Sequence, residues 1–268
     1  MRLDKPIGIL LLWLPTARAL WIANQGKPPL HLLIYFLAGT IVMRSAGCVV
    51  NDMADRNIDK HVKRTAMRPL TTGEVSQVHA LGLIGLLLLI ALGIVMMLAR
   101  NCFYLALVAV ALTVLYPFCK RFLQAPQLVL GLAFSMGIPM AFIASGVSDN
   151  TSMLILLLIN FAWIVSYDTM YAMVDRDDDL RIGVKSTAVL FAQYDRGIIL
   201  LLQLLLHCGW FYLAWSLHYS ARFFTCWAIA SLVLIYQQKL VHSRNNAECF
   251  KAFKFNAYYG FFIWMGLW

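Results

Sequence analysis

The sequence predicts an all-α integral membrane protein, a bundle of nine transmembrane helices with cytoplasmic loops that cap a polar site. First, 61% of the 268 residues are hydrophobic and 13% are charged, with a mean hydropathy of +0.73, whereas a soluble domain carries about twice that charged fraction. Second, the apolar residues are grouped in blocks long enough to cross a membrane as helices. Third, two acidic motifs follow apolar blocks on the same side of the bundle.

The apolar blocks define the expected elements in chain order. They are residues 7–24, 30–51, 78–99, 102–118, 126–146, 152–173, 196–217, 222–239 and 253–268. The first block lacks a small-residue cleavage site, so it is interpreted as a span and not as a signal peptide. The second and sixth blocks end at the acidic motifs, and the last block is short. Pro15, Pro117 and Pro139 lie in or near three of the spans, where membrane helices tolerate kinks.

The distribution of basic residues predicts the orientation. With the N-terminus inside, 17 of the 22 Lys and Arg residues fall in inside segments, and Lys27, Arg100 and Arg222 fall in outside segments. Cytoplasmic connections are enriched in Lys and Arg. We therefore expect the N-terminus and the two acidic connections, residues 56–73 and 175–194, in the cytoplasm.

Neither the net charge nor the cysteines indicate another class of protein. The formal net charge of +9 fits basic loops beside anionic lipid, and the chain has no basic patch interleaved with aromatic residues of the kind that binds nucleic acid. The six cysteines are scattered without a CxxC pair, which is typical of small packing residues.

The two acidic motifs resemble each other. Residues 55–59 and 175–179 both read DRxxD, 120 residues apart, and a VKxT element follows each of them at 62–65 and 184–187. The sequence therefore predicts one domain over residues 1–268, with a possible internal four-helix repeat of about 1–125 and 126–240 plus a ninth helix.

The first motif continues a polar stripe. Arg44, Asn51, Asp55 and Asp59 are spaced so that they share one face of a helix, whereas Asp52 points elsewhere. Carboxylates four residues apart present oxygen ligands about one turn from each other. Two such ends brought together would suit Mg²⁺, which is usually held by a few carboxylates plus substrate phosphate.

Basic residues accompany both motifs. Those in the cytoplasmic connections are Lys63, Arg64, Arg68, Lys120, Arg121, Arg181 and Lys185. Cations beside a carboxylate-held metal form a diphosphate site, although each one alone is also explained by topology. A diphosphate site above an apolar bundle predicts a polyprenyl diphosphate as substrate. Mg²⁺ and cations would stabilise the departing diphosphate, and a dry pocket would protect the allylic cation from water.

Aromatic faces can stabilise such a cation. The candidates are Trp13, Tyr104, Tyr116, Phe134, Phe142, Tyr167 and Tyr171. Arg44 has two interpretations, since a buried Arg needs an anion. It could pair with Asp52 or Asp168, or it could receive the carboxylate of a second, aromatic acid substrate.

At this point the residues show a family resemblance. Residues 47–70 (GCVVNDMADRNIDKHVKRTAMRPL) and 167–191 (YDTMYAMVDRDDDLRIGVKSTAVLF) resemble the two Asp-rich signatures of the UbiA-type intramembrane prenyltransferases. RLDKPIG, YPFCKR, SMGIPMAF and YQQKL also fit, so the resemblance extends over nearly the whole chain. It is strongest to the bacterial 4-hydroxybenzoate polyprenyltransferase branch of the ubiquinone pathway.

The resemblance implies Mg²⁺-dependent transfer of a polyprenyl group to the ring of 4-hydroxybenzoate, ortho to the phenol, in the bacterial cytoplasmic membrane. Carried over by position, the metal-binding residues are Asp52, Asp55, Asp59, Asp175 and Asp179. Arg121 matches a position associated with substrate, and Arg44 and Asn51 match positions associated with the aromatic acid. We expect Lys63, Arg64, Lys120 and Lys185 to aid the phosphates, and Tyr116 and Tyr171 to line the substrate site.

Three other functions compete with this one. A sister prenyltransferase would use 1,4-dihydroxy-2-naphthoate, haem or a chlorophyll precursor. A cation-coupled transporter would place its acids at the membrane midplane between broken helices, whereas here they cluster beside basic loops. A non-catalytic scaffold would leave both acidic motifs unexplained.

Overall fold

The computed structural model describes residues 1–62 and 64–268, and the part of the chain that it describes is all helical. The helices, in chain order, are α1 (Ile7–Ala23), α2 (Leu30–Ala54), α3 (Arg56–Asp59), α4 (Pro69–Thr72), α5 (Gln77–Val95), α6 (Arg100–Cys119), α7 (Gln127–Ser135), α8 (Gly137–Ala144), α9 (Asn150–Ile182), α10 (Thr187–Phe191), the 3₁₀ turn η1 (Ala192–Tyr194), α11 (Asp195–Ser216), α12 (Ala221–His242) and α13 (Asn246–Gly266).

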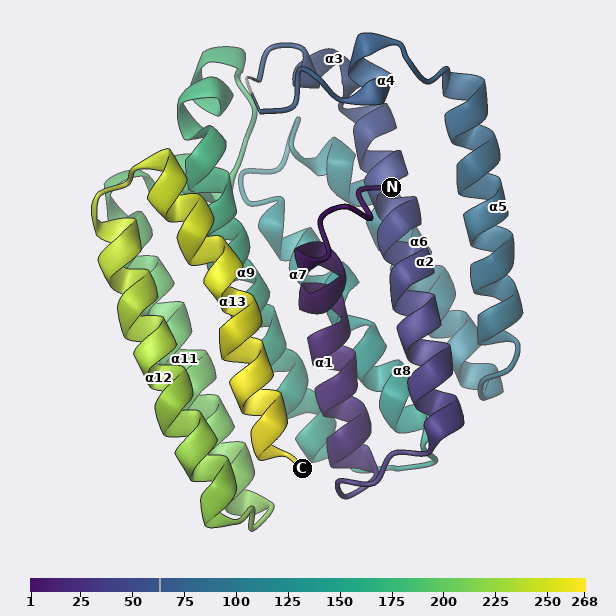
Figure 1. The fold of residues 1–268 in the computed structure, drawn as a ribbon, viewed down its shortest axis with the longest axis vertical. Helices are drawn as coiled ribbons and strands as arrows, with labels where there is room; N and C mark the ends of the chain where they lie inside the picture. Colours follow the sequence, from purple (N-terminus) through teal and green to yellow (C-terminus); the bar gives the residue numbers. More distant parts are fainter. Residues whose placement is uncertain (63) are drawn as a thin grey trace.

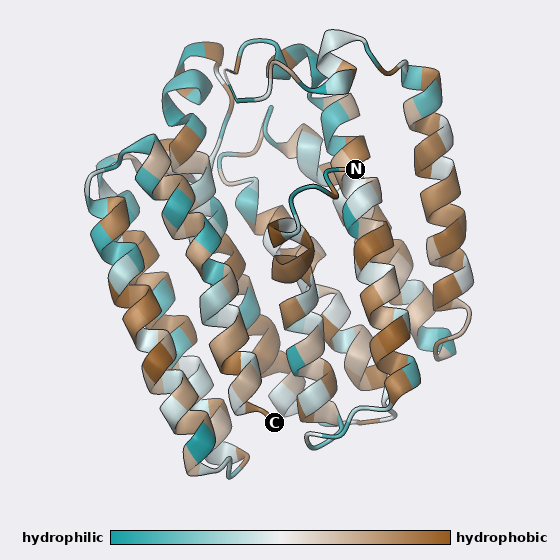
Figure 2. Ribbon diagram, in the orientation of Figure 1, coloured by the Kyte–Doolittle hydropathy of each residue, from teal (hydrophilic) through white to brown (hydrophobic). Residues whose placement is uncertain are grey.

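The long helices run side by side, and α1 lies in the middle of the bundle between α2 and α13, with α8 against it (Figure 1). The short helices α3 and α4 close one end, which we call the polar end. Figure 2 shows hydrophilic residues gathered at this end and hydrophobic residues along the lengths of the helices. Large apolar side chains such as Leu89, Leu158 and Leu232 face outward, each more than half exposed, as expected for helices surrounded by lipid.

Counting α7 and α8 as one span, the described residues confirm the predicted bundle of nine long segments. Seven segments are long and apolar enough to cross a membrane by these measures alone. Of the other two, α1 has 17 residues and α13 carries Glu248, Lys251 and Lys254 in its first turns. The protein is a multi-pass membrane protein.

The fifth span differs from the prediction because it is broken at Met136. Pro139 lacks the N–H that would donate to Ser135, so α7 ends there and α8 begins at Gly137. Gly137 also permits close packing, because a Cβ at this position would lie 2.1 Å from Thr16 Oγ1 of α1. The break therefore lets α1 approach the bundle centre.

Two segments predicted as loops are helical. The sixth span does not end at 173: α9 continues as one helix to Ile182 and stops at Gly183, whose φ of +72° suits glycine. The second motif is therefore on a rigid helix that projects beyond the apolar region. The last span is also longer than predicted, because the Asn245 side chain accepts hydrogen bonds from Ala247 and Glu248 and starts α13 at Asn246.

The core of the bundle holds a buried arginine. Arg18 of α1 is 1% exposed, and its guanidinium lies 4.4 Å from the ring centre of Trp163 and 5.3 Å from that of Trp210. Its Nε donates to Leu14 O within α1. Cation–π contacts of this kind are strongest when they are desolvated, so Arg18 joins α1 to α9 and α11.

Candidate active site

A cavity of about 1190 Å³ opens between α1, α2 and α5 to α9 and reaches the polar end. Its charged lining lies at that end, where the two acidic motifs meet the basic residues. Farther along the bundle the lining is apolar and includes Leu92 and Val95 of α5, Val110 of α6 and Met140 of α8. The cavity therefore has a charged head and a hydrocarbon-like body.

The first motif turns at Asp55. The helical stripe predicted from Arg44 to Asp59 is interrupted, because α2 ends at Ala54, Asp55 has φ −92° and ψ 1°, and α3 begins at Arg56. Arg121 Nη2 donates to Ala54 O at 2.9 Å, which satisfies a carbonyl at the helix end. Asp59 consequently lies on a separate short helix, not on the continuation of α2.

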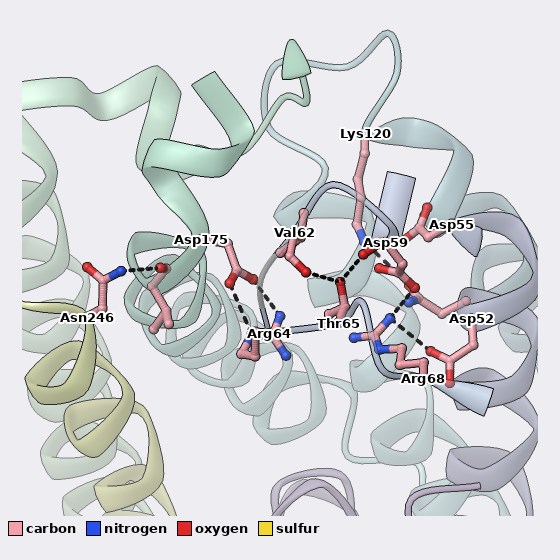
Figure 3. Close-up of polar contacts among 12 residues, drawn as sticks. Asp52, Asp55, Asp59, Val62, Arg64, Thr65, Arg68, Lys120, Asp175 and Asn246 are labelled. Carbon is pink, nitrogen blue, oxygen red and sulfur yellow. Dashed lines mark hydrogen bonds and ion pairs between the residues drawn. The ribbon is translucent and has the colours of Figure 1, made fainter. Parts of the chain in front are cut away.

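Each acid of the first motif is buried and has a cationic partner. Asp55 is 2% exposed, and its Oδ2 accepts from Lys120 Nζ at 2.7 Å (Figure 3). Arg68 Nη1 lies 2.7 Å from Asp59 Oδ2 and 3.0 Å from Asp52 Oδ1. Arg2 of the N-terminal segment also forms an ion pair with Asp52. The negative charge of the motif is therefore matched by cations from three different parts of the chain.

The second motif meets the first through Arg64. Arg64 Nε donates to Asp175 Oδ1 at 3.0 Å, and Nη2 donates to Asp175 Oδ2, so that the pair is bidentate (Figure 3). The Arg64 guanidinium also lies 4.7 Å from the Tyr171 ring centre. Asp179 is buried, one turn farther along α9, and lines the same cavity. The structure thus brings together at the polar end two motifs that lie 120 residues apart in the sequence.

Burial shifts the pKa of groups at the polar end. It raises the pKa of the Asp59 carboxyl above its usual range, although the Arg68 guanidinium opposes this effect. Burial also acts to lower the pKa of Arg64, but its hydrogen bonds and charge interaction with Asp175 outweigh that effect, and the net shift is upward. Arg64 is therefore a permanent cation at the site.

Arg44 lines the cavity below the motifs without an ion pair. No carboxylate among the described residues lies in salt-bridge contact with it, so the alternative in which it pairs with Asp52 or Asp168 is wrong in this structure. Gly8 of α1 packs directly on its guanidinium, since a Cβ there would lie 2.5 Å from Arg44 Nε. Asn51 lies two turns nearer the polar end, and its Oδ1 is 3.5 Å from Lys120 Nζ. A partly buried cation without an anion is a suitable receptor for a carboxylate.

Of the aromatic candidates, Tyr116, Phe134, Tyr167 and Tyr171 line the cavity. Lys120 Nζ lies 5.4 Å from the Tyr116 ring centre. Tyr104 is 53% exposed on the outer surface, and Phe142 is buried in the core. Trp13 packs against the core as well. Four of the seven predicted aromatic residues therefore line the cavity.

Two of the predicted cations, Lys185 and Arg121, donate to backbone carbonyls and not to the motif carboxylates. Lys185 Nζ donates to Phe122 O at 2.9 Å, and its own N–H donates to Lys120 O at 3.0 Å. Arg121, besides its bond to Ala54, lies 5.3 Å from the Phe118 ring centre and is absent from the cavity lining. These contacts position Asp55 and Lys120 from outside. The predicted residue Lys63 lies outside the described residues.

The donor set fits a metal that is completed by substrate. Within residues 1–62 and 64–268, no three His, Cys, Asp or Glu side chains already form a metal-ligand group. Asp55 Oδ1, however, is buried without a hydrogen-bond partner, and an unsatisfied buried oxygen costs about 1–3 kcal/mol. Mg²⁺ normally uses few carboxylates and takes its other ligands from phosphate and water. Asp55 Oδ1 is thus the atom that most clearly lacks a cation.

Two cations of the site do not follow from the sequence patterns. In the sequence, Arg2 serves only as one of the basic residues that indicate the orientation. In the structure it pairs with Asp52, 50 residues away. Arg68 belongs in the sequence to the group of loop cations, yet in the structure it bridges Asp52 and Asp59. The one signal for Arg2 is its place in the RLDKPIG segment, because no spacing rule connects the N-terminus to α2.

A charged head above an apolar cavity, inside a membrane bundle, suits an amphiphile with an anionic head. The sequence matches the UbiA prenyltransferase family over residues 12–266, and the chain belongs to this family. It is 58% identical to the 4-hydroxybenzoate octaprenyltransferase of Legionella pneumophila (strain Corby), covering 100% of this chain and 95% of the relative. It is 52% identical to the protein of that name from Haemophilus ducreyi, covering 100% and 96%.

Solved structures agree on the fold. The apo structure of a UbiA homolog from Aeropyrum pernix K1 superposes with a TM-score of 0.84 at 23% identity, over 99% of this chain and 98% of that one. A UbiA homolog from Archaeoglobus fulgidus, solved bound to GPP and Mg²⁺, gives a TM-score of 0.75 at 19% identity, over 99% and 96%. These matches confirm the nine-segment bundle.

Proposed function

We propose that this chain transfers a polyprenyl group from polyprenyl diphosphate to the ring of 4-hydroxybenzoate, ortho to the phenol, to give 3-polyprenyl-4-hydroxybenzoate for ubiquinone biosynthesis. The observation that carries the proposal is the cavity, whose charged head and apolar body match the two parts of a polyprenyl diphosphate. The curated relatives named for this reaction match the chain over its full length.

In this proposal the metal ligands are the acids at the charged head: Asp52, Asp55, Asp59, Asp175 and Asp179. The unpartnered Asp55 Oδ1 supports the assignment, as does the Mg²⁺ named with the Archaeoglobus fulgidus homolog. When bound there, Mg²⁺ would neutralise charge on the departing diphosphate. A metal is held by the ionised carboxylate and not by the protonated carboxyl.

The cations would exchange partners when substrate binds. Lys120, Arg64 and Arg68 each hold a motif carboxylate in this structure. Once those carboxylates turn to a metal, the three cations can donate to phosphate oxygens within the same head. Hydrogen bonds between charged donors and phosphate are about twice as strong as neutral ones. The site therefore keeps its charges balanced both before and after it binds the substrate.

The aromatic acid would bind deeper than the diphosphate. Among the described residues, Arg44 has no ion-pair partner, so its guanidinium can receive the carboxylate of the aromatic acid. Asn51 lies between Arg44 and the motif acids. Tyr116 and Tyr171 offer ring faces at the boundary, where the allylic cation would form. The apolar walls beyond them would exclude water from that cation and hold the prenyl tail.

We also propose the location. The relatives are bacterial, and the distribution of Lys and Arg favours a cytoplasmic membrane with the N-terminus and the polar end on the cytoplasmic side. The diphosphate would then enter from the cytoplasm while the tail stays in the membrane lipid. The proposed partners are the two substrates and membrane lipid, and nucleic acid is not one of them.

The test uses purified protein in detergent or lipid with Mg²⁺, 4-hydroxybenzoate and prenyl diphosphates of several lengths, with the product identified by mass. We expect ring-prenylated 4-hydroxybenzoate and no product after chelation of Mg²⁺. Parallel reactions with 1,4-dihydroxy-2-naphthoate test the sister activity. Transfer to that acceptor but not to 4-hydroxybenzoate would contradict the proposal, and so would ion uptake by vesicles without any prenyl transfer.

A further inference from the structure

Asp168 is a buried carboxylate that belongs to neither Asp-rich motif. It lies on α9, is 9% exposed and lines the cavity. It precedes Asp175 by seven residues, which places it about 10 Å deeper along the helix. An ionisable side chain at this depth in a membrane bundle is costly and usually functional.

Among the described residues, Asp168 has no ion-pair partner. Lys120, Arg44 and Arg64 are the cations near it, and all three line the same cavity as Asp168. Among the described residues, however, none of them forms an ion pair with it, because Lys120 holds Asp55 and Arg64 holds Asp175. The Tyr116 side chain also lies beside it. Asp168 is thus kept in a cationic surrounding but not neutralised by contact.

The other acids of the cavity, apart from the exposed Asp4 at its rim, are committed elsewhere. Asp52, Asp55, Asp59 and Asp175 are all held in ion pairs, and with substrate bound the motif acids would serve the metal. Asp179 lies three turns farther toward the polar end, away from Arg44. A group that receives a proton from the acceptor ring must lie near Arg44. Asp168 meets this condition, because it lines the same cavity as Arg44 and lies within reach of its charge.

We propose that Asp168 is the base that removes the ring proton in the transfer to 4-hydroxybenzoate, an inference that rests on the proposed function. With the acceptor carboxylate on Arg44 and the diphosphate at the polar end, the ring would lie in the part of the cavity that Asp168 also lines. A base in contact with the reacting carbon contributes about 10²- to 10⁴-fold to the rate of proton transfer.

Proton removal by Asp168 completes a substitution on the ring. The bond from C1 of the prenyl group to the diphosphate oxygen breaks, and both electrons leave with the diphosphate. A pair of ring π electrons then forms the bond from the ortho carbon to C1, which leaves the ring cationic. The C–H electrons at that carbon return to the ring and restore aromaticity, while the proton passes to an Asp168 oxygen. Water takes the proton from the neutral Asp168 as the products leave.

The test compares the wild type with Asp168→Asn, Asp168→Glu and Asp177→Asn, using 4-hydroxybenzoate with hydrogen or deuterium at both carbons ortho to the phenol. Asp177 is a matched control, because it is an exposed acid on the same helix that does not line the cavity. In Asp168→Asn we expect kcat to fall about 100-fold or more and its isotope effect to exceed that of the wild type, since proton loss becomes limiting.

We expect the prenyl diphosphate KM to stay unchanged in Asp168→Asn, Asp168→Glu to keep part of kcat, and Asp177→Asn to behave as wild type. If Asp168→Asn cannot be folded, the same comparison is made with Asp168→Glu, where a lower kcat must also come with a larger isotope effect. Wild-type turnover in either variant, or a loss without a larger isotope effect, would overturn the role of Asp168. Failure of the proposed function would look different, since the wild type itself would then give no prenylated product.

Discussion

Arg64 and Asp175 form a bidentate ion pair across 111 residues, with Arg64 Nε 3.0 Å from Asp175 Oδ1. This pair joins the connection after the first Asp-rich motif to the helix that carries the second. Tyr171, one turn before Asp175, lies against the same guanidinium. The polar end is therefore organised by an arginine, and the two motifs meet through it.

Arg64→Lys should separate charge from geometry. Lysine keeps the positive charge but has neither the planar fork nor the same ring stacking, so one charge-assisted hydrogen bond of about 1.5–3 kcal/mol is lost. We expect the prenyl diphosphate KM to rise roughly 10- to 100-fold, with a smaller change in the KM of the aromatic acceptor. Steady-state kinetics with each substrate varied in turn measures both. An equal rise in both values would contradict a role at the diphosphate.

Asp55→Asn should remove the proposed metal ligand whose oxygen is buried without a hydrogen-bond partner. The amide preserves shape but loses the charge opposite Lys120 and replaces one carboxylate oxygen with nitrogen. We expect prenyl transfer to fall about 100-fold or more and the Mg²⁺ concentration for half-maximal activity to increase. Asp177→Asn is again the control. Full activity in Asp55→Asn at unchanged Mg²⁺ would remove this residue from the metal site.

The sequence was sufficient for the spans and for the existence of the site. Hydropathy determines which segments enter the membrane, and the repeated DRxxD pattern places both motifs at one end. The sequence did not predict which cation pairs with which carboxylate. Arg64 and Arg68 lie four residues apart in the same connection, yet one holds Asp175 and the other holds Asp52 and Asp59. That choice depends on where α9 is placed relative to α2 in the folded bundle, which no local pattern records.

The ends of helices were missed for a related reason. Residues 174–182 are polar, so hydropathy ends the sixth span before them, but a polar segment can continue a helix once it leaves the membrane. Here α9 continues with an Arg181–Asp178 ion pair on its surface until Gly183. At Asp55 the reverse occurs, and a predicted continuous stripe turns because Arg121 satisfies the Ala54 carbonyl. Both outcomes depend on contacts from distant parts of the chain.

Gly8→Ala should act on the acceptor through Arg44. The added Cβ would lie 2.5 Å from Arg44 Nε and 2.6 Å from Nη2, so the guanidinium must move. We expect the KM of the aromatic acceptor to rise roughly 10-fold, equivalent to about 1.4 kcal/mol, with the prenyl diphosphate KM little changed. Gly82→Ala on α5 is the matched control, because nothing lies within 4 Å of its added Cβ. Equal effects of the two substitutions would show that Gly8 has no special relation to Arg44.

Asp195→Ala should lower stability without a direct effect on the site. Asp195 is fully buried at the start of α11 and is paired with Arg176 of α9 and Arg244 before α13. Arg176 and Arg244 are 24% and 39% exposed, so water partly replaces the lost partner and the expected cost is about 1–3 kcal/mol. We expect a clear fall in the melting temperature in detergent, while both KM values of the surviving protein stay near those of the wild type. An unchanged melting temperature would contradict the structural role.

The dependence on Mg²⁺ should change with pH in a direction set by the buried carboxyls Asp59 and Asp179, because burial raises the pKa of both. Each of them therefore takes up a proton at a higher pH than an ordinary aspartate. A protonated carboxyl is a poor Mg²⁺ ligand, so the Mg²⁺ concentration for half-maximal activity should increase as the pH falls through those raised pKa values. Arg68 opposes the rise at Asp59, and Arg68→Ala should therefore move the profile to higher pH. A profile that stays in place, or moves to lower pH, would show that Asp59 does not govern metal binding.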